Sequence, residues 1–138
     1  SQISRIVIGQ SSWEQAGGSG VVAAAPAGGA ARTVSHSNAR HLYYAPAQQL
    51  AHHAISGCAM ATGDLLGSGT ISGPTHDGCG SLLELTRNGR EPLDLDGVRR
   101  GFLEDGDTVR LRGWCKGAVR IGFGTCEGTI LPAPEPPV

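Results

Sequence analysis

The chain has 138 residues, enough for one domain with its own core, but its composition is thin for that purpose. Hydrophobic residues make up 39% of the sequence, yet aromatic residues make up only 4% and 22 residues are glycine, so most apolar side chains are small. The formal net charge of −1 gives no electrostatic reason to expect a nucleic acid or an anionic membrane surface as partner, and we predict neither.

Targeting signals and cysteines predict the compartment. No apolar run approaches the roughly 20 residues of a membrane helix, and residues 1–10 lack the pattern of a signal peptide. We therefore expect a cytoplasmic protein. The even cysteine count allows two disulfides, but without an export signal we predict free thiols used for packing. These cysteines are Cys58, Cys79, Cys115 and Cys126.

Residues 1–34 carry the least information. An apolar segment at residues 3–8 is followed by an Ala/Gly-rich stretch at residues 14–32. Because these side chains offer little to pack, we interpret residues 14–32 as a linker, a poorly ordered segment, or a segment that lies against something absent. We divide the chain into this N-terminal segment, a domain at residues 35–134 and a tail at residues 135–138.

A helix is expected after an extended segment at residues 33–44. In residues 45–57, Pro46 suits the first helical position and Gly57 suits the stop. One face of this helix is apolar: Ala47, Leu50, Ala51, Ala54 and Ile55. His52 and His53 lie on the other face. Helix neighbours point about 100° apart, so we interpret these two histidines as structural and not as metal ligands.

The remainder predicts short strands and turns. We expect strands at residues 64–73, 81–86, 91–95, 108–114 and from 119 to 123 onward. Asn88-Gly89 is typical of a hairpin turn, and Asp96-Gly97 and Asp105-Gly106 mark further turns. In residues 108–114, Val109 and Leu111 should point inward. The predicted fold is α+β, mainly β, with one short helix and no parallel βαβ pattern.

Glu84 is the most informative single residue. In a strand at residues 81–86, Glu84 shares a face with Leu82 and Thr86, where water should be scarce. A buried carboxylate needs a partner or a function. Two interpretations stay open: a functional group, or a structural carboxylate bound to an arginine or to backbone amides. In the loop at residues 73–80, His76, Asp77 and Cys79 match no metal-ligand spacing, so we favour a polar turn.

Several segments together resemble the C-terminal part of the catalytic domain in the fumarylacetoacetase branch of the fumarylacetoacetate hydrolase family. These are "SNARHLYYAPAQQLAHHAISGC", "GDLLGSGTISGP", "GSLLEL", "FLEDGDTVRLRGWC" and "RIGFGTCEGTILPA", over about residues 35–134. The resemblance implies part of the family's β-roll, with mixed sheets and one short helix. It also implies hydrolysis of fumarylacetoacetate to fumarate and acetoacetate, in tyrosine and phenylalanine breakdown.

The resemblance also implies roles for two residues. Glu84 corresponds to a catalytic glutamate that lies beside a histidine from an earlier part of the chain and helps it activate water. Thr70 corresponds to a threonine that hydrogen-bonds the substrate. A plainer interpretation of Thr70 is a hydroxyl that satisfies a strand edge.

The family's metal, Ca²⁺ or Mg²⁺, is bound by carboxylates that lie upstream of the matching region, as do the histidine base and the lysine and arginine that stabilise the leaving group. We therefore expect no metal ligands in this chain, and we interpret it as the C-terminal portion of a catalytic domain that forms a homodimer when complete. Two alternatives remain: a non-catalytic β-rich binding or assembly module, and a fragment of a related oxo-acid hydrolase or decarboxylase.

Overall fold

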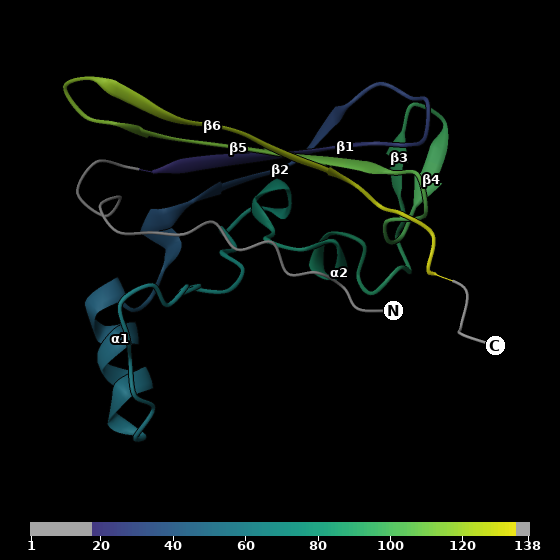
Figure 1. The fold of residues 1–138 in the computed structure, drawn as a ribbon. Coiled ribbons are helices and arrows are strands. Elements are labelled where there is room, and N and C mark those ends of the chain that lie inside the picture. The colour runs from purple at the N-terminus through teal and green to yellow at the C-terminus, as the bar shows by residue number, and fades with distance from the viewer. Residues whose placement is uncertain (1–17, 135–138) are drawn as a thin grey trace.

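The computed structural model describes residues 18–134, in which a four-stranded antiparallel sheet covers a layer of loops and short helices (Figure 1). The sheet has the order β2-β1-β5-β6, and β3 and β4 form a separate hairpin. The strands are β1 (Ser19–Ala25), β2 (Arg32–Asn38), β3 (Leu93–Leu95), β4 (Val98–Arg100), β5 (Thr108–Lys116) and β6 (Arg120–Thr129). The predicted α+β, mainly β class is confirmed. The sheets that the resemblance implied to be mixed are both antiparallel within these residues.

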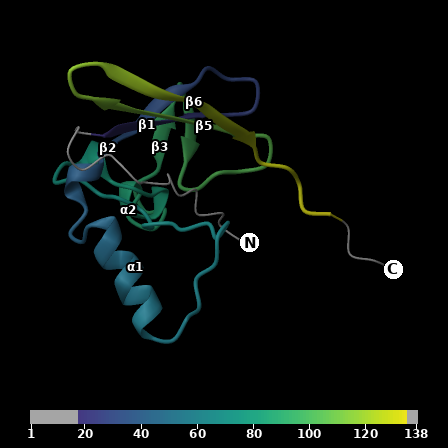
Figure 2. The ribbon, with the colours of Figure 1, turned by 60° about the vertical axis from the view of Figure 1, so that its left-hand side comes forward.

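Four short helical elements accompany the strands: η1 (Ala39–His41), α1 (Pro46–Ile55), η2 (His76–Gly78) and α2 (Leu82–Leu85). The helix predicted at residues 45–57 is confirmed as α1, with Pro46 as its first residue and Gly57 in a left-handed conformation (φ 87°) after its end. Figures 1 and 2 show α1 projecting away from the sheet. None of its residues is buried, and Ile55 is 85% exposed. The apolar face of α1 is therefore not covered within the described residues.

The interpretation of residues 14–32 as a linker or poorly ordered segment is wrong for the residues of strand β1. It lies at the centre of the sheet and pairs with both β2 and β5. Ala24 is only 3% exposed. Small side chains are compatible with a central strand, because cross-strand hydrogen bonds and the neighbouring strands stabilise it. The part of that interpretation before residue 18, and the apolar segment at residues 3–8, lie outside the described residues.

The core lies between the sheet and the layer beneath it. The inward alternation predicted for β5 is confirmed, since Val109 and Leu111 are buried. The last strand is confirmed as β6, but its residues are all exposed. The buried apolar residues are Ala24, Ala39, Leu85, Leu95, Val109, Leu111 and Cys115. The four cysteines are free, as predicted, although only Cys115 is buried. No helix in residues 18–134 is long and apolar enough to cross a membrane.

Two predicted strands are wrong. Residues 64–73 form no strand, and residues 82–85 form the one-turn helix α2. The predicted hairpin at Asn88-Gly89 is consequently also wrong. Residues 87–89 instead have positive φ angles of 46°, 59° and 78° and form the turn that follows α2. The turn at Asp96-Gly97 is confirmed: it joins β3 to β4, with φ angles of 57° and 87°, as a type I′ turn requires.

Candidate functional site

Glu84 lies in α2, at the third position of this one-turn helix. Ser81 is the N-cap, and its hydroxyl accepts a hydrogen bond from the Glu84 amide at 3.4 Å. The sequence Ser81-Leu-Leu-Glu84 is the pattern of a capping box, which starts a helix. This signal explains why the segment is helical, and the strand prediction missed it.

The helical geometry corrects the expected burial of Glu84. The carboxylate is exposed, whereas Leu85 and Thr86 are buried at 3% and 0% exposure. A helix turns about 100° per residue, so Glu84 does not share a face with Leu82 and Thr86. The buried polar group of this segment is Thr86, whose hydroxyl lies 2.7 Å from the Leu82 carbonyl oxygen and 2.9 Å from that of Gly101. Thr86 therefore links α2 to the segment before β5.

One oxygen of the Glu84 carboxylate is held by two donors. The Ser72 hydroxyl donates to Oε2 at 2.5 Å, and the Gly80 amide lies 3.3 Å from the same atom. The Gly80 amide also donates to the Ser72 hydroxyl at 3.0 Å. Within residues 18–134, Oε1 makes no hydrogen bond or ion pair. The carboxylate is thus oriented by its neighbours while one acceptor oxygen stays available.

Gly80 also fixes the distance between the two segments that carry the predicted site residues. A Cβ atom on Gly80 would lie 2.8 Å from the Ile71 carbonyl oxygen and 2.9 Å from the Ile71 nitrogen. Only a glycine permits this approach of one backbone to another. Thr70 precedes Ile71, and Glu84 follows Gly80 by four residues. The close contact therefore holds the Thr70 and Glu84 segments together.

Thr70 lines a cavity of about 210 Å³ beneath the sheet. Its side chain is exposed, and within the described residues its hydroxyl has no hydrogen-bond partner. No strand runs through Thr70, so its interpretation as a hydroxyl that satisfies a strand edge is wrong. Most of the cavity wall is aliphatic, with Val22, Val34, Leu82, Leu103, Val109 and Leu111 among the lining residues. Glu84 is not one of them.

The polar groups of the cavity wall are largely engaged. The Ser35 hydroxyl donates to the Cys79 carbonyl at 2.7 Å, and the Ser37 hydroxyl donates to the Ile71 carbonyl at 2.6 Å. These bonds attach the loop at residues 71–79 to β2. Within the described residues Thr70 is thus the wall hydroxyl that makes no hydrogen bond, whereas the Ser81 hydroxyl accepts one from the Glu84 amide.

Of the other candidate residues in the described part of the chain, only Cys79 lines this cavity. The His76 ring donates from Nε2 to the Leu85 carbonyl oxygen at 2.9 Å, since a carbonyl can only accept. Burial raises the pKa of the Cys79 thiol, and the negative charges of Glu84 and Asp77 raise it further. In the part of the chain that the structure describes, no three His, Cys, Asp or Glu side chains lie close enough together to hold a metal ion. His52 and His53 lie on the exposed helix α1.

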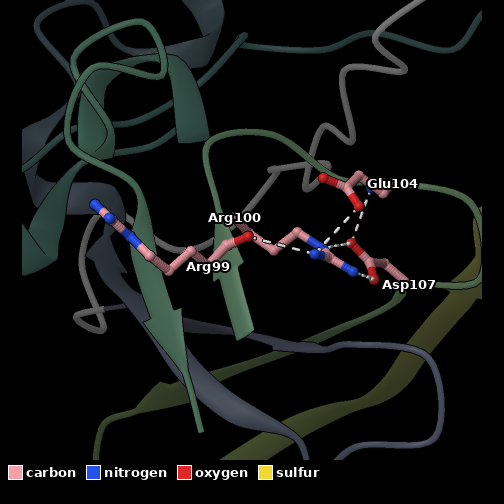
Figure 3. Close-up of polar contacts among 4 residues, drawn as sticks. All are labelled: Arg99, Arg100, Glu104 and Asp107. Atoms are coloured by element: carbon pink, nitrogen blue, oxygen red, sulfur yellow. Dashed lines mark hydrogen bonds and ion pairs between the residues drawn. The ribbon is translucent and has the colours of Figure 1, made fainter. Parts of the chain in front are cut away.

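A buried ion pair stabilises the segment between β4 and β5 (Figure 3). Asp107 is 1% exposed and accepts hydrogen bonds from Arg100 Nε at 2.8 Å and from the Glu104 amide at 2.8 Å. Burial alone would raise the pKa of Asp107, but the hydrogen bonds from Arg100 and the backbone outweigh it and lower that pKa. Arg100 also bridges Glu104 at 3.1 Å. Both oxygens of the Asp107 carboxylate accept hydrogen bonds, which indicates a structural role.

Comparison with known proteins adds a family match. A family model described as "Fumarylacetoacetate (FAA) hydrolase C-terminal" matches residues 22–131, beginning within β1 and upstream of residue 35, where the motif resemblance begins. The chain is 59% identical to a fumarylacetoacetase of Aspergillus fumigatus over 109 residues, which cover 78% of this chain and 25% of the relative.

Two further relatives match this chain in a similar way. A fumarylacetoacetase of Arabidopsis thaliana is 55% identical over 102 residues, 73% of this chain and 24% of the relative. The human fumarylacetoacetase is 50% identical over 105 residues, 75% of this chain and 25% of the relative. The chain thus spans about a quarter of the length of the curated relatives it matches.

Proposed function

Because this chain belongs to the fumarylacetoacetate hydrolase family, we propose that it forms the C-terminal part of an enzyme that hydrolyses the carbon–carbon bond of fumarylacetoacetate. The products of this reaction are fumarate and acetoacetate, from tyrosine and phenylalanine breakdown. The relatives named fumarylacetoacetase carry about three quarters of their length outside the matched region. The proposal therefore applies to this chain when it is combined with segments like those that make up the other three quarters of these relatives.

The observation that carries the proposal is the state of the Glu84 carboxylate. Its Oε2 is fixed by Ser72 and Gly80, while Oε1 faces solvent with no partner among residues 18–134. A fixed carboxylate with one available oxygen can accept a hydrogen bond from an imidazole N–H. That bond selects the tautomer that takes a proton from water and stabilises the imidazolium that results. We assign Glu84 this role toward a histidine supplied from outside the matched quarter.

Thr70 is proposed to bind a substrate oxygen. Its hydroxyl is available, and Gly69 before it has a left-handed backbone (φ 81°), which turns the chain next to the cavity. The aliphatic wall beneath it offers few partners to a charged substrate, because the Ser35 and Ser37 hydroxyls are engaged. These features support binding of the polar end of the substrate at Thr70 and not deeper in the cavity.

The metal implied by the family does not fit the residues described. Ca²⁺ takes six to eight oxygen ligands, and Mg²⁺ takes a near-octahedral set, whereas residues 18–134 bring no three potential ligands together. The identity of the metal, Ca²⁺ or Mg²⁺, stays part of the proposal, with ligands outside this chain, and no step is derived through it. A cytoplasmic location and a homodimeric complete enzyme are proposed as well.

The test compares the isolated chain with the chain co-expressed with the N-terminal three quarters of the Aspergillus relative. We expect the isolated chain to bind no Ca²⁺ in calorimetry and to leave the absorbance of fumarylacetoacetate unchanged. The co-expressed pair should bind Ca²⁺ and consume the substrate, and the matched variant Glu84→Gln should lose turnover. Turnover by the isolated chain would contradict the incomplete site. A well-formed but inactive pair would favour the alternative of a non-catalytic module.

A further inference from the structure

Ser72 is the donor nearest to the Glu84 carboxylate. Its hydroxyl lies 2.5 Å from Oε2, a distance typical of an O–H group that donates to a charged oxygen. A serine hydroxyl has one proton and an ionised carboxylate can only accept, so that proton points to Oε2. The Gly80 amide donates to the same hydroxyl at 3.0 Å and lies 3.3 Å from Oε2. Because this amide proton is shared between two acceptors, the bond from Ser72 is the stronger of the two.

The backbone on both sides of Ser72 is held in place. On its N-terminal side, the Ser37 hydroxyl of β2 donates to the Ile71 carbonyl at 2.6 Å. On its C-terminal side, the Gly73 amide donates to the Gly78 carbonyl at 2.8 Å. Ser72 itself is half-buried. Its hydroxyl therefore starts from a fixed backbone and can orient a side chain that reaches it from another element.

The Glu84 side chain needs such support. It is exposed and long, and within residues 18–134 no cation forms an ion pair with it. A glutamate side chain loses rotamer freedom when it is held in one direction, and only bonds to its carboxylate can offset that loss. The two donors act on Oε2 and leave Oε1 as the acceptor for an incoming N–H group.

We propose that Ser72 is a positioning residue, whose hydroxyl decides which oxygen of Glu84 is presented to the histidine. This inference rests on the proposed function, because Glu84 must accept a hydrogen bond from that histidine. Without the hydroxyl, the shared Gly80 amide is the remaining donor, and the carboxylate turns away from the direction that the imidazole requires. The contact of the substrate with Thr70 is a separate one. Ser72 therefore affects turnover and not substrate affinity.

The first test follows the orientation of Glu84 in the 138-residue chain by nuclear magnetic resonance. The Gly80 amide proton reports on the carboxylate, because this amide lies against Oε2. In the wild-type background Glu84→Gln should shift the Gly80 resonance, and in a Ser72→Ala background the same substitution should shift it much less. Equal shifts in both backgrounds would overturn the proposal, since Gly80 would then hold the carboxylate by itself. If Ser72→Ala fails to fold, Ser72→Cys replaces it, because a thiol is similar in shape but a weak donor.

The second test measures turnover of the chain co-expressed with the N-terminal three quarters of the Aspergillus relative. Ser72→Ala should lower kcat by roughly tenfold to a hundredfold, as expected for a misplaced catalytic group, and leave KM unchanged. In a Glu84→Gln background Ser72→Ala should lower kcat no further, because the two residues act as a unit. The matched control is Ser56→Ala on α1, which removes a hydroxyl bonded to the His53 carbonyl at 3.0 Å and should leave kcat unchanged.

The outcomes separate this inference from the proposed function. If Glu84→Gln leaves turnover near normal, or the pair is inactive, the proposed function is wrong, and the Gly80 resonance still decides whether Ser72 orients the carboxylate. If Glu84→Gln lowers turnover and Ser72→Ala does not, the proposed function stands and the role of Ser72 is refuted. Equal losses of kcat from Ser72→Ala in both backgrounds would make Ser72 merely structural, which also refutes it.

Discussion

Replacing Gly80 by alanine tests how closely the Thr70 and Glu84 segments are held. The new Cβ would lie 2.8 to 3.0 Å from three atoms of Ile71, its carbonyl oxygen, nitrogen and carbonyl carbon. All three are backbone atoms, so no side-chain rotation can relieve the clash, and the two segments must separate. Overpacking of this kind costs about 1–3 kcal/mol. Alanine also restricts the unfolded chain, which returns about 0.4–1 kcal/mol. The net expectation is a loss of about 1–2 kcal/mol in the free energy of unfolding.

The assay is urea unfolding of the wild type, Gly80→Ala and a matched control. Gly117→Ala serves as the control, because no atom lies within 4 Å of its Cβ position and its φ is outside the left-handed region. This substitution should leave stability unchanged or raise it by up to about 1 kcal/mol. Gly80→Ala should therefore lower the unfolding midpoint, whereas Gly117→Ala should leave it unchanged or raise it. If Gly80→Ala is as stable as Gly117→Ala, the close backbone contact does not exist as described.

Three further predictions concern the site and its support. In the complete enzyme, Glu84→Gln should lower turnover by roughly a hundredfold to ten-thousandfold while thermal unfolding changes little; near-normal turnover would contradict a role in catalysis. Thr70→Val keeps the shape but removes the hydroxyl, so substrate binding should weaken by roughly 1–3 kcal/mol and KM should rise; unchanged kinetics with lower stability would make Thr70 structural. The pKa of Asp107 is lowered in the folded chain, so its contribution to stability should be present above its ordinary pKa of about 3.9 and be lost as the pH falls through the folded value. Urea midpoints from pH 7 to pH 3 measure this loss of stability, and Asp107→Asn should make it smaller. At pH 7 the same variant should lower the free energy of unfolding by about 3 kcal/mol, because Arg100 is left without its main partner.

Sequence patterns predicted the elements whose side chains are large or whose ends carry strong signals. Helix α1 has a proline at its start and a glycine after its end, and β5 alternates aliphatic and arginine side chains over its central residues. In each case the local signal and the final structure agree. Strand β1 was missed because Val21 to Ala25 lacks both alternation and large side chains. Its place is decided by pairing with β2 and β5, and no local pattern reports that pairing.

The roles of Glu84 and Thr70 stay predictions, which rest on the motifs. The expected surroundings of Glu84 were wrong because three leucines in four positions were interpreted as a strand, although Ser81 and Glu84 form a helix-starting pair. Ser72 was not foreseen as the donor to Glu84, since it lies twelve positions earlier and no spacing rule connects the two. The requirement for glycine at position 80 could not be predicted from the sequence either, because it arises from the nearby Ile71 backbone.

The central position of β1 has a consequence for the order of folding. Its hairpin partner β2 follows it directly, whereas its other partner, β5, is synthesised only after both α-helices and the β3–β4 hairpin. Ala25 pairs with Thr108, so the pairing of β1 with β5 closes a long loop of the chain. Such nonlocal pairing slows folding. During translation, the β1 edge of the β1–β2 hairpin should stay unpaired until β5 leaves the ribosome. An unpaired strand edge of this kind makes the chain prone to aggregation in that interval.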